Sequence, residues 1–171
     1  VLSADTANAY YDHIDNCLGR DEFLPRALFE QFNVEMLATT DAATDQLPWH
    51  QQLRDSGWKG RIVTTYRPDA AVDPEFPGFA KTVAELGKIT QEDTSSWAGY
   101  LAAHRSRRAY FKSFGATATD HGHASARTAD LPPADAEALF AKVLASTSTP
   151  DEADLFRGQM LTEMARMSLD D

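Results

Sequence analysis

The stretch RIVTTYRPD, residues 61–69, decides how the fold of this chain is interpreted. Its β-branched run at 62–65 predicts a buried strand, because such side chains pack well on a pleated surface. Pro68 has no amide hydrogen and disfavours the helical conformation at Arg67, so the strand should end there. In open α/β sheets and β/α barrels, the carboxyl ends of the strands carry the chemistry. Arg67 is therefore a candidate site residue.

Two other stretches have the same form, a short strand that runs into polar residues. An expected strand at 33–40 closes on Asp41, and another at 116–119 runs into Asp120. A helix expected at 45–56 follows the first strand, which gives the spacing of a βαβ unit and a parallel pair. We therefore predict an α/β fold with about three parallel strands, a large helical insertion before the third, and a mostly helical composition.

Helical patterns cover most of the remaining sequence. Apolar spacing predicts helices at 3–18, 23–32 and 79–86, with Gly87 ending the last of these. Thr90 and Asp93 resemble a capping box that opens a long helix running to residue 114. Further helices are expected from Pro132 and Pro133, and from a capping box formed by Thr149 and Glu152, with the methionines of the last helix as core.

Composition narrows the classes of partner. The formal charge of −10 argues against nucleic acid and anionic membrane surfaces. Cys17 is the only cysteine, so no intrachain disulfide is possible and a cytoplasmic location is expected. No apolar run approaches the length of a membrane span, and no signal peptide is visible. A local exception to the acidic balance is a basic cluster that we expect on a solvated helix face: His104, Arg105, Arg107 and Arg108.

The polar strand ends are the candidate site. Arg67 at a buried strand end needs an anionic partner, which is either a ligand or a structural pair with Asp41 or Asp120. The alternative role of Asp41 is to cap the following helix. The alternative role of Asp69 is that of an ordinary turn residue. His121 is expected as a hydrogen-bonding wall of the pocket. Convergence of these side chains on one pocket is the economical interpretation.

His121 and His123 also form an H-x-H pair, a spacing that binds zinc when both side chains leave the same face of a strand. Here Gly122 lies between them and the strand is expected to have ended, so the pair does not by itself predict a metal site. The other histidines, His13, His50 and His104, lie on expected helices as surface or satisfied core residues.

The segments FNVEMLATTDAATDQLPWHQQLRDSGWKGRIVTTYRPD (32–69) and FKSFGATATDHGHASARTADL (111–131) resemble uronate isomerases of the amidohydrolase superfamily. The resemblance implies a distorted (β/α)8 TIM-type barrel. It also implies conversion of D-glucuronate to D-fructuronate, or of D-galacturonate to D-tagaturonate, by proton transfer between C2 and C1 beside one divalent metal, usually zinc. Within this pattern, Arg67 matches the arginine expected to bind the substrate carboxylate.

The resemblance divides the chain into a helical segment at 1–32, a β/α barrel portion at 33–72, a helical insertion at 73–115, and a barrel strand, loop and helices at 116–171. The family's metal ligands, an H-x-H, a further His and an Asp-x-Arg, have no counterpart here, and His121 and His123 lie in a different motif. We therefore expect an internal fragment whose main catalytic groups are elsewhere, with no isomerase activity and no tightly bound metal of its own.

Two alternatives stay open from the residues. One is a related metal-dependent barrel hydrolase, and the other is a non-enzymatic α/β module that uses Arg67 to bind an acidic metabolite. For the isomerase interpretation the expected partner is a small-molecule uronate substrate. A homo-oligomer is a further expectation, because barrel strands without their neighbours leave open sheet edges.

Overall fold

The computed structural model describes residues 1–170. Within them the chain forms eight α-helices, one short 3-10 helix (η1) and a two-stranded sheet. The elements, in order, are α1 Ala7–Leu18, η1 Asp21–Phe23, α2 Pro25–Gln31, β1 Leu37–Ala42, α3 Pro48–Asp55, β2 Ile62–Arg67, α4 Asp69–Val72, α5 Phe79–Thr90, α6 Trp97–Ser113, α7 Pro133–Leu144 and α8 Pro150–Asp170.

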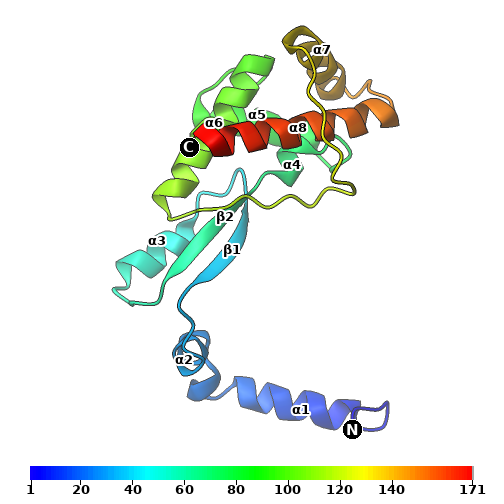
Figure 1. Ribbon diagram of the computed structural model, residues 1–171. Coiled ribbons are helices and arrows are strands. Elements are labelled where there is room, and N and C mark those ends of the chain that lie inside the picture. Colours follow the sequence, from blue (N-terminus) through cyan, green and yellow to red (C-terminus); the bar gives the residue numbers. More distant parts are fainter. Residues whose placement is uncertain (171) are drawn as a thin grey trace.

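The elements form three parts along the long axis of Figure 1. Helices α1 and α2 make an arm that extends away from the rest of the chain, and the sheet with α3 lies between this arm and the remaining helices. None of the described helices has the length and apolar character required to cross a bilayer.

The expected parallel pair is confirmed. β1 and β2 pair in parallel, from Leu37 opposite Ile62 to Ala42 opposite Arg67. The first strand begins later than predicted, because Asn33 has a positive φ of 50° and the amide of Val34 still bonds to the carbonyl of Phe29 at the end of α2.

The third expected strand, 116–119, is reduced to a single bridge. Thr119 lies parallel to Tyr66, and the Tyr66 amide donates to the Ala118 carbonyl over 3.3 Å. The Asp120 amide in turn donates to the Tyr66 carbonyl over 3.0 Å. The next donor of such a parallel ladder would be the amide of residue 68, which proline lacks. The parallel direction was predicted correctly, but a full strand does not form.

Two helix boundaries near the insertion differ from prediction. Helix α5 continues through Gly87 and ends at Thr90, with Gln91 at φ 62° as its C-cap. Packing explains why residue 87 is a glycine, since a Cβ there would lie 2.5 Å from the Thr94 hydroxyl. The chain therefore crosses closely over α5 at this point, and Gly87 does not end the helix.

Helix α6 starts at Trp97 rather than near the predicted box at Thr90 and Asp93. Ser96 is its N-cap, and its hydroxyl accepts a hydrogen bond from the Gly99 amide over 3.1 Å. The Asp93 side chain instead accepts from the amide and hydroxyl of Ser95. A serine one turn closer to the helix thus displaces the predicted cap.

Gly99 offers a test of this tight turn. A Cβ at Gly99 would lie 2.1 Å from the Asp93 carbonyl oxygen, a backbone atom that cannot move without disturbing the cap. Gly99→Ala should lower the free energy of unfolding by about 1–3 kcal/mol, measured by urea denaturation. Gly19→Ala is the matched control, because its nearest contact would be an ordinary 3.8 Å. An unchanged midpoint for Gly99→Ala would contradict the prediction.

The start of the last helix is confirmed. The Thr149 hydroxyl accepts from the Glu152 amide over 3.2 Å, and the Glu152 carboxylate accepts from the Thr149 amide over 2.9 Å. This reciprocal pair is the predicted capping box. From it α8 runs with its methionine face buried, as expected, at Met160, Met164 and Met167.

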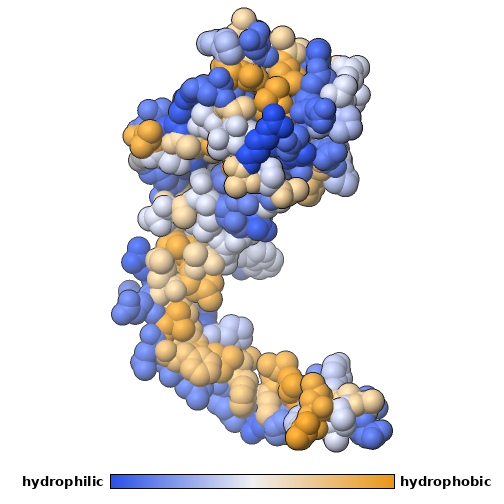
Figure 2. Space-filling model, turned by 45° about the vertical axis from the view of Figure 1, so that its right-hand side comes forward, coloured by the Kyte–Doolittle hydropathy of each residue, from blue (hydrophilic) through white to orange (hydrophobic). Residues whose placement is uncertain are grey.

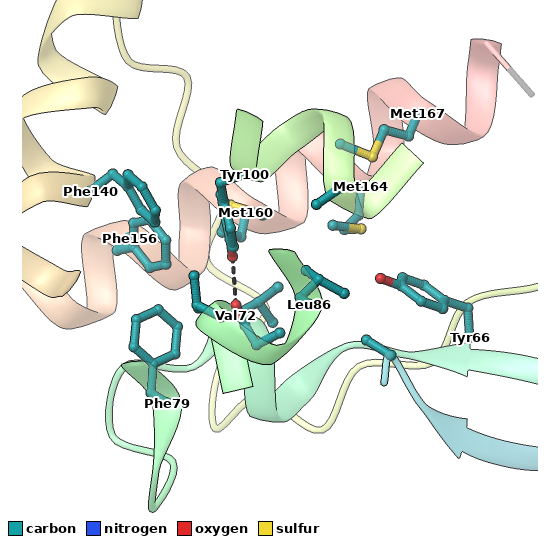
Figure 3. Close-up of a cluster of buried hydrophobic side chains, with 14 of the residues drawn as sticks. Tyr66, Val72, Phe79, Leu86, Tyr100, Phe140, Phe156, Met160, Met164 and Met167 are labelled. Atoms are coloured by element: carbon teal, nitrogen blue, oxygen red, sulfur yellow. Dashed lines mark hydrogen bonds between the residues drawn. The ribbon is translucent and has the colours of Figure 1, made fainter. Parts of the chain in front are cut away.

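The core lies where α8 packs against α4 to α7 (Figure 3). Tyr100 of α6 stacks on Phe140 of α7 with ring centroids 4.6 Å apart, and Phe140 stacks on Phe156 of α8 at 6.1 Å. The Tyr100 hydroxyl donates to the Ala71 carbonyl over 2.6 Å, the bond drawn in Figure 3. Tyr66 brings the carboxyl end of β2 to the edge of this core.

The arm has no such core. No residue of α1 or α2 is buried, and Figure 2 shows apolar side chains gathered along this part of the molecule. The exposed large apolar residues of the arm are Tyr10, Tyr11, Ile14, Leu18, Leu24 and Phe32. Apolar area of this extent is typical of a surface that another part of a protein covers.

Candidate functional site

Arg67 is held between two carboxylates at the carboxyl end of β2. Its Nη2 lies 2.7 Å from Asp120 Oδ2, and its Nε lies 3.4 Å from Asp69 Oδ2. Asp69 opens α4 directly after Pro68, and Asp120 follows the bridge to Tyr66. The structure thus brings together three of the side chains predicted from the strand ends. The Arg67 side chain remains 45% exposed, so an anion from outside can reach it.

Asp69 is more than the turn residue that its position after proline permits. Its two carboxylate oxygens accept from the Gly122 amide over 3.0 and 3.1 Å, which ties α4 to the loop after the bridge. A Cβ at Gly122 would lie 2.7 Å from Asp69 Oδ2. A side chain at residue 122 would therefore displace the Asp69 carboxylate from this close approach to the backbone.

His121 and His123 flank this contact. Their ring centroids are 5.5 Å apart, and one ligand atom from each of Asp69, His121 and His123 lies within 4.8 Å of the others. Burial lowers the pKa of both histidines, with His123 adding to the effect at His121. Neutral imidazoles beside a carboxylate are groups that could hold a metal ion. Sequence reasoning placed His121 in the pocket wall but left His123 without a role.

Asp41 does not join the Arg67 group. Its Oδ2 accepts from the hydroxyls of Thr39 and Thr64, each over 2.6 Å, and lies 3.8 Å from His50 Nε2. It neither pairs with Arg67 nor caps α3, two roles that the sequence left open. Asp41 instead links β1, β2 and α3 in a local hydrogen-bond group.

The prediction of a solvated face for the basic cluster on α6 is correct for Arg105, which is exposed, and wrong for the other three residues. His104, Arg107 and Arg108 are buried, with His104 fully so. The Arg107 Nε donates to the Ala43 carbonyl over 2.7 Å, so this guanidinium provides a hydrogen-bond partner for a backbone acceptor in the loop after β1. The physical reason is position, because α6 packs against β2 and these side chains meet protein groups rather than water: His104 contacts the Tyr66 hydroxyl and Arg108 donates to the Ser168 hydroxyl.

His104 connects this cluster to the strand end. Its Nδ1 lies 2.8 Å from the Tyr66 hydroxyl, and burial, followed by Arg108, lowers its pKa to about 3. Burial also raises the pKa of Tyr66, which therefore stays a phenol that can donate to the neutral ring. The pair fixes the residue next to Arg67. A histidine in line with the apolar residues Trp97 and Leu101 was the signal available in the sequence.

A cavity of about 330 Å³ lies beside the bridge between Tyr66 and Thr119. Arg108, Phe111 and Ser168 contribute to its lining, together with residues 116–119. Its walls come from α6, α8, Tyr66 of β2 and the bridging segment, and they do not include the Arg67 group.

Comparison with known proteins gives one family. A model of the glucuronate isomerase family matches residues 1–170. The uronate isomerases of Rhizobium meliloti (strain 1021) and Mesorhizobium japonicum are 59% and 58% identical, over 99% of this chain and 36% of their own lengths. The chain thus spans about a third of the length of these curated relatives.

Comparison with solved structures also gives glucuronate and uronate isomerases. The crystal structure of glucuronate isomerase from Caulobacter crescentus superimposes with a TM-score of 0.91 at 48% identity, over 100% of this chain and 36% of that one. Uronate isomerase from Thermotoga maritima gives a TM-score of 0.85 at 27% identity, over 99% of this chain and 38% of that one. With the family model matching nearly every residue, the chain belongs to the glucuronate isomerase family.

Proposed function

We propose that this chain supplies the carboxylate-binding part of a uronate isomerase that converts D-glucuronate to D-fructuronate, or D-galacturonate to D-tagaturonate. The observation that carries the proposal is the family match over residues 1–170. The chain's own contribution to such an enzyme is the Arg67 group at the end of β2.

We also propose that the strands of this chain are part of a (β/α)8 barrel. β1, β2 and the segment that bridges at Thr119 would be three neighbouring parallel strands of a (β/α)8 barrel. Their parallel direction supports this, as does the grouping of Arg67, Asp69 and Asp120 at one edge. In this proposal residues 33–72 and 116–171 belong to the barrel, 1–32 lead into it, and 73–115 are a helical insertion.

Arg67 suits the substrate carboxylate for chemical reasons. A guanidinium is planar, permanently charged and able to donate two parallel hydrogen bonds to a carboxylate. Asp69 and Asp120 contact Nε and Nη2, which orients the group and leaves Nη1 toward an incoming anion. Binding at this end would position the distant C1 and C2 atoms of the open-chain sugar for proton transfer.

The remaining chemistry belongs to other groups. The family resemblance implies a divalent metal, usually zinc, which when bound would polarise the substrate carbonyl. The ligand motifs of that metal have no counterpart in this sequence. We therefore propose that the 171-residue chain alone does not turn over uronates.

Arg67→Met in the complete enzyme tests the assignment. Loss of a charge-assisted pair with the substrate carboxylate should lower kcat/KM for the uronate about 30- to 150-fold, chiefly through KM, if about 2–3 kcal/mol is lost. The matched control is Arg105→Met, since Arg105 is also half-exposed and ion-paired, 3.6 Å from Asp170. Arg67→Lys should recover part of the loss. Kinetics of Arg67→Met close to those of Arg105→Met would refute the carboxylate role.

A further inference from the structure

Three nitrogen atoms near Asp69 have no hydrogen-bond partner in the part of the chain that the structure describes. They are Nδ1 of His121 and both ring nitrogens of His123, and all three are shielded from solvent. Buried polar atoms without partners are uncommon, because leaving them unpaired costs free energy. Their position around one carboxylate is suited to a group that accepts electron pairs, such as a metal cation.

In contrast to the expectation from the sequence that this chain binds no metal tightly, we propose that Asp69, His121 and His123 form a binding site for a divalent transition metal such as Zn²⁺. One ligand atom from each residue already lies within 4.8 Å of the other two. Two imidazole nitrogens and one carboxylate oxygen are a donor set that suits zinc and its neighbours better than magnesium or calcium. Three protein ligands leave a fourth position for water or another small ligand.

The local charge favours a cation. Asp69 and Asp120 carry two negative charges against the single positive charge of Arg67. His121 and His123 have lowered pKa values, mainly through burial, so at neutral pH their rings are uncharged and their lone pairs are open to a metal. Asp73 and Arg157, whose charges also act on His123, form an ion pair of 2.9 Å and largely offset each other.

The backbone prepares the site. The Gly122 amide, from the residue between the two histidines, donates to both oxygens of the Asp69 carboxylate, which leaves further lone pairs on these oxygens for a metal. Ligand atoms around tetrahedral zinc are separated by about 3.4 Å, given bonds of about 2.0–2.1 Å. Closing the present group from within 4.8 Å therefore needs only small side-chain rotations.

This site does not depend on the isomerase assignment, since it uses only atoms of this chain. It is also distinct from the ligand set that the family resemblance implies. The two can be separated experimentally, because failure of the metal site would leave the family membership and the role of Arg67 untouched.

Titration of the 171-residue chain with Co²⁺ tests the proposal. Binding of one equivalent should give the visible d–d absorption of a four-coordinate site, which Zn²⁺ displaces and Mg²⁺ does not. His123→Gln should weaken Co²⁺ binding at least about 100-fold, since ligand loss should exceed the 10–100-fold effect of outer-shell changes. The control is His13→Gln, an exposed histidine on α1 that should leave binding unchanged.

Two further measurements guard against a misfolded variant. Histidine ring resonances in NMR spectra should shift on Zn²⁺ addition for His121 and His123 but not for His13. Gly122→Ala keeps all three ligands yet should weaken Co²⁺ binding, because its Cβ would displace the Asp69 carboxylate. Equal shifts at all histidines, or equal loss of binding in His13→Gln and His123→Gln, would overturn the site, as would no binding by the folded chain.

Discussion

Phe156→Ala should lower the free energy of unfolding by about 3–5 kcal/mol, the usual cost of emptying a fully buried phenylalanine site. Phe156 is completely buried, and its ring packs against those of Phe140, Tyr100 and Phe79 at centroid distances of 6.1, 6.3 and 6.2 Å. These rings come from α5, α6 and α7, so the cavity would open where all three meet α8. Rigid stacked rings cannot collapse into the space.

Urea denaturation followed by circular dichroism measures this loss. Phe32→Ala is the control, because Phe32 is 70% exposed and its removal should change stability by less than about 0.5 kcal/mol. Equal effects of the two substitutions would mean that the aromatic cluster does not hold the helices together.

Lowering the pH from 7.5 to 5.0 should destabilise the fold by about 2 kcal/mol through His104 alone. The pKa of His104 is lowered from 6.5 to about 3 by burial, so between these values the unfolded chain binds a proton that the folded chain does not. Stability is therefore complete above pH 6.5 and falls with the pH toward 3. A protonated ring would place an unpaired charge at Nε2, which has no partner among the described residues.

The test compares unfolding free energies at the two pH values in wild type, His104→Gln and His13→Gln. His104→Gln should remove about 2 kcal/mol of the pH-dependent loss, whatever its effect on stability at pH 7.5. His13→Gln should retain the loss. His121 and His123, whose pKa values are also lowered by burial, act in the same direction in all three proteins. A pH-dependent loss as large in His104→Gln as in wild type would contradict the prediction.

Local signals predicted the elements that depend on local chemistry. The β-branched run before Pro68 is the strand β2, and the box of Thr149 and Glu152 starts α8. Thr90 was predicted to open α6, whereas Ser96 caps it, and the segment between these two residues passes close to Gly87. That contact is tertiary, and no propensity encodes it.

The candidate site likewise contains residues whose grouping the sequence predicted and residues whose position it did not. Strand ends on one edge of a sheet must lie near one another, which was enough to predict the grouping of Arg67, Asp69 and Asp120. Asp41 lies at an equivalent end, yet threonine hydroxyls on both strands bind it instead. The position of His123 depends on a loop conformation held by the contact between Gly122 and Asp69, which alternation along a strand cannot predict.

The contact between Gly122 and Asp69 also bears on the order in which the chain folds. It joins residues 53 apart in sequence, whereas the bond from Thr64 to Asp41 between the two strands joins residues only 23 apart. Closing the longer loop costs about 0.7 kcal/mol more chain entropy. Because α5 and α6 lie within the longer loop, we expect β1 and β2 to pair before the Arg67 group closes. The polar group at the strand ends would then form late in folding, on a sheet that already exists.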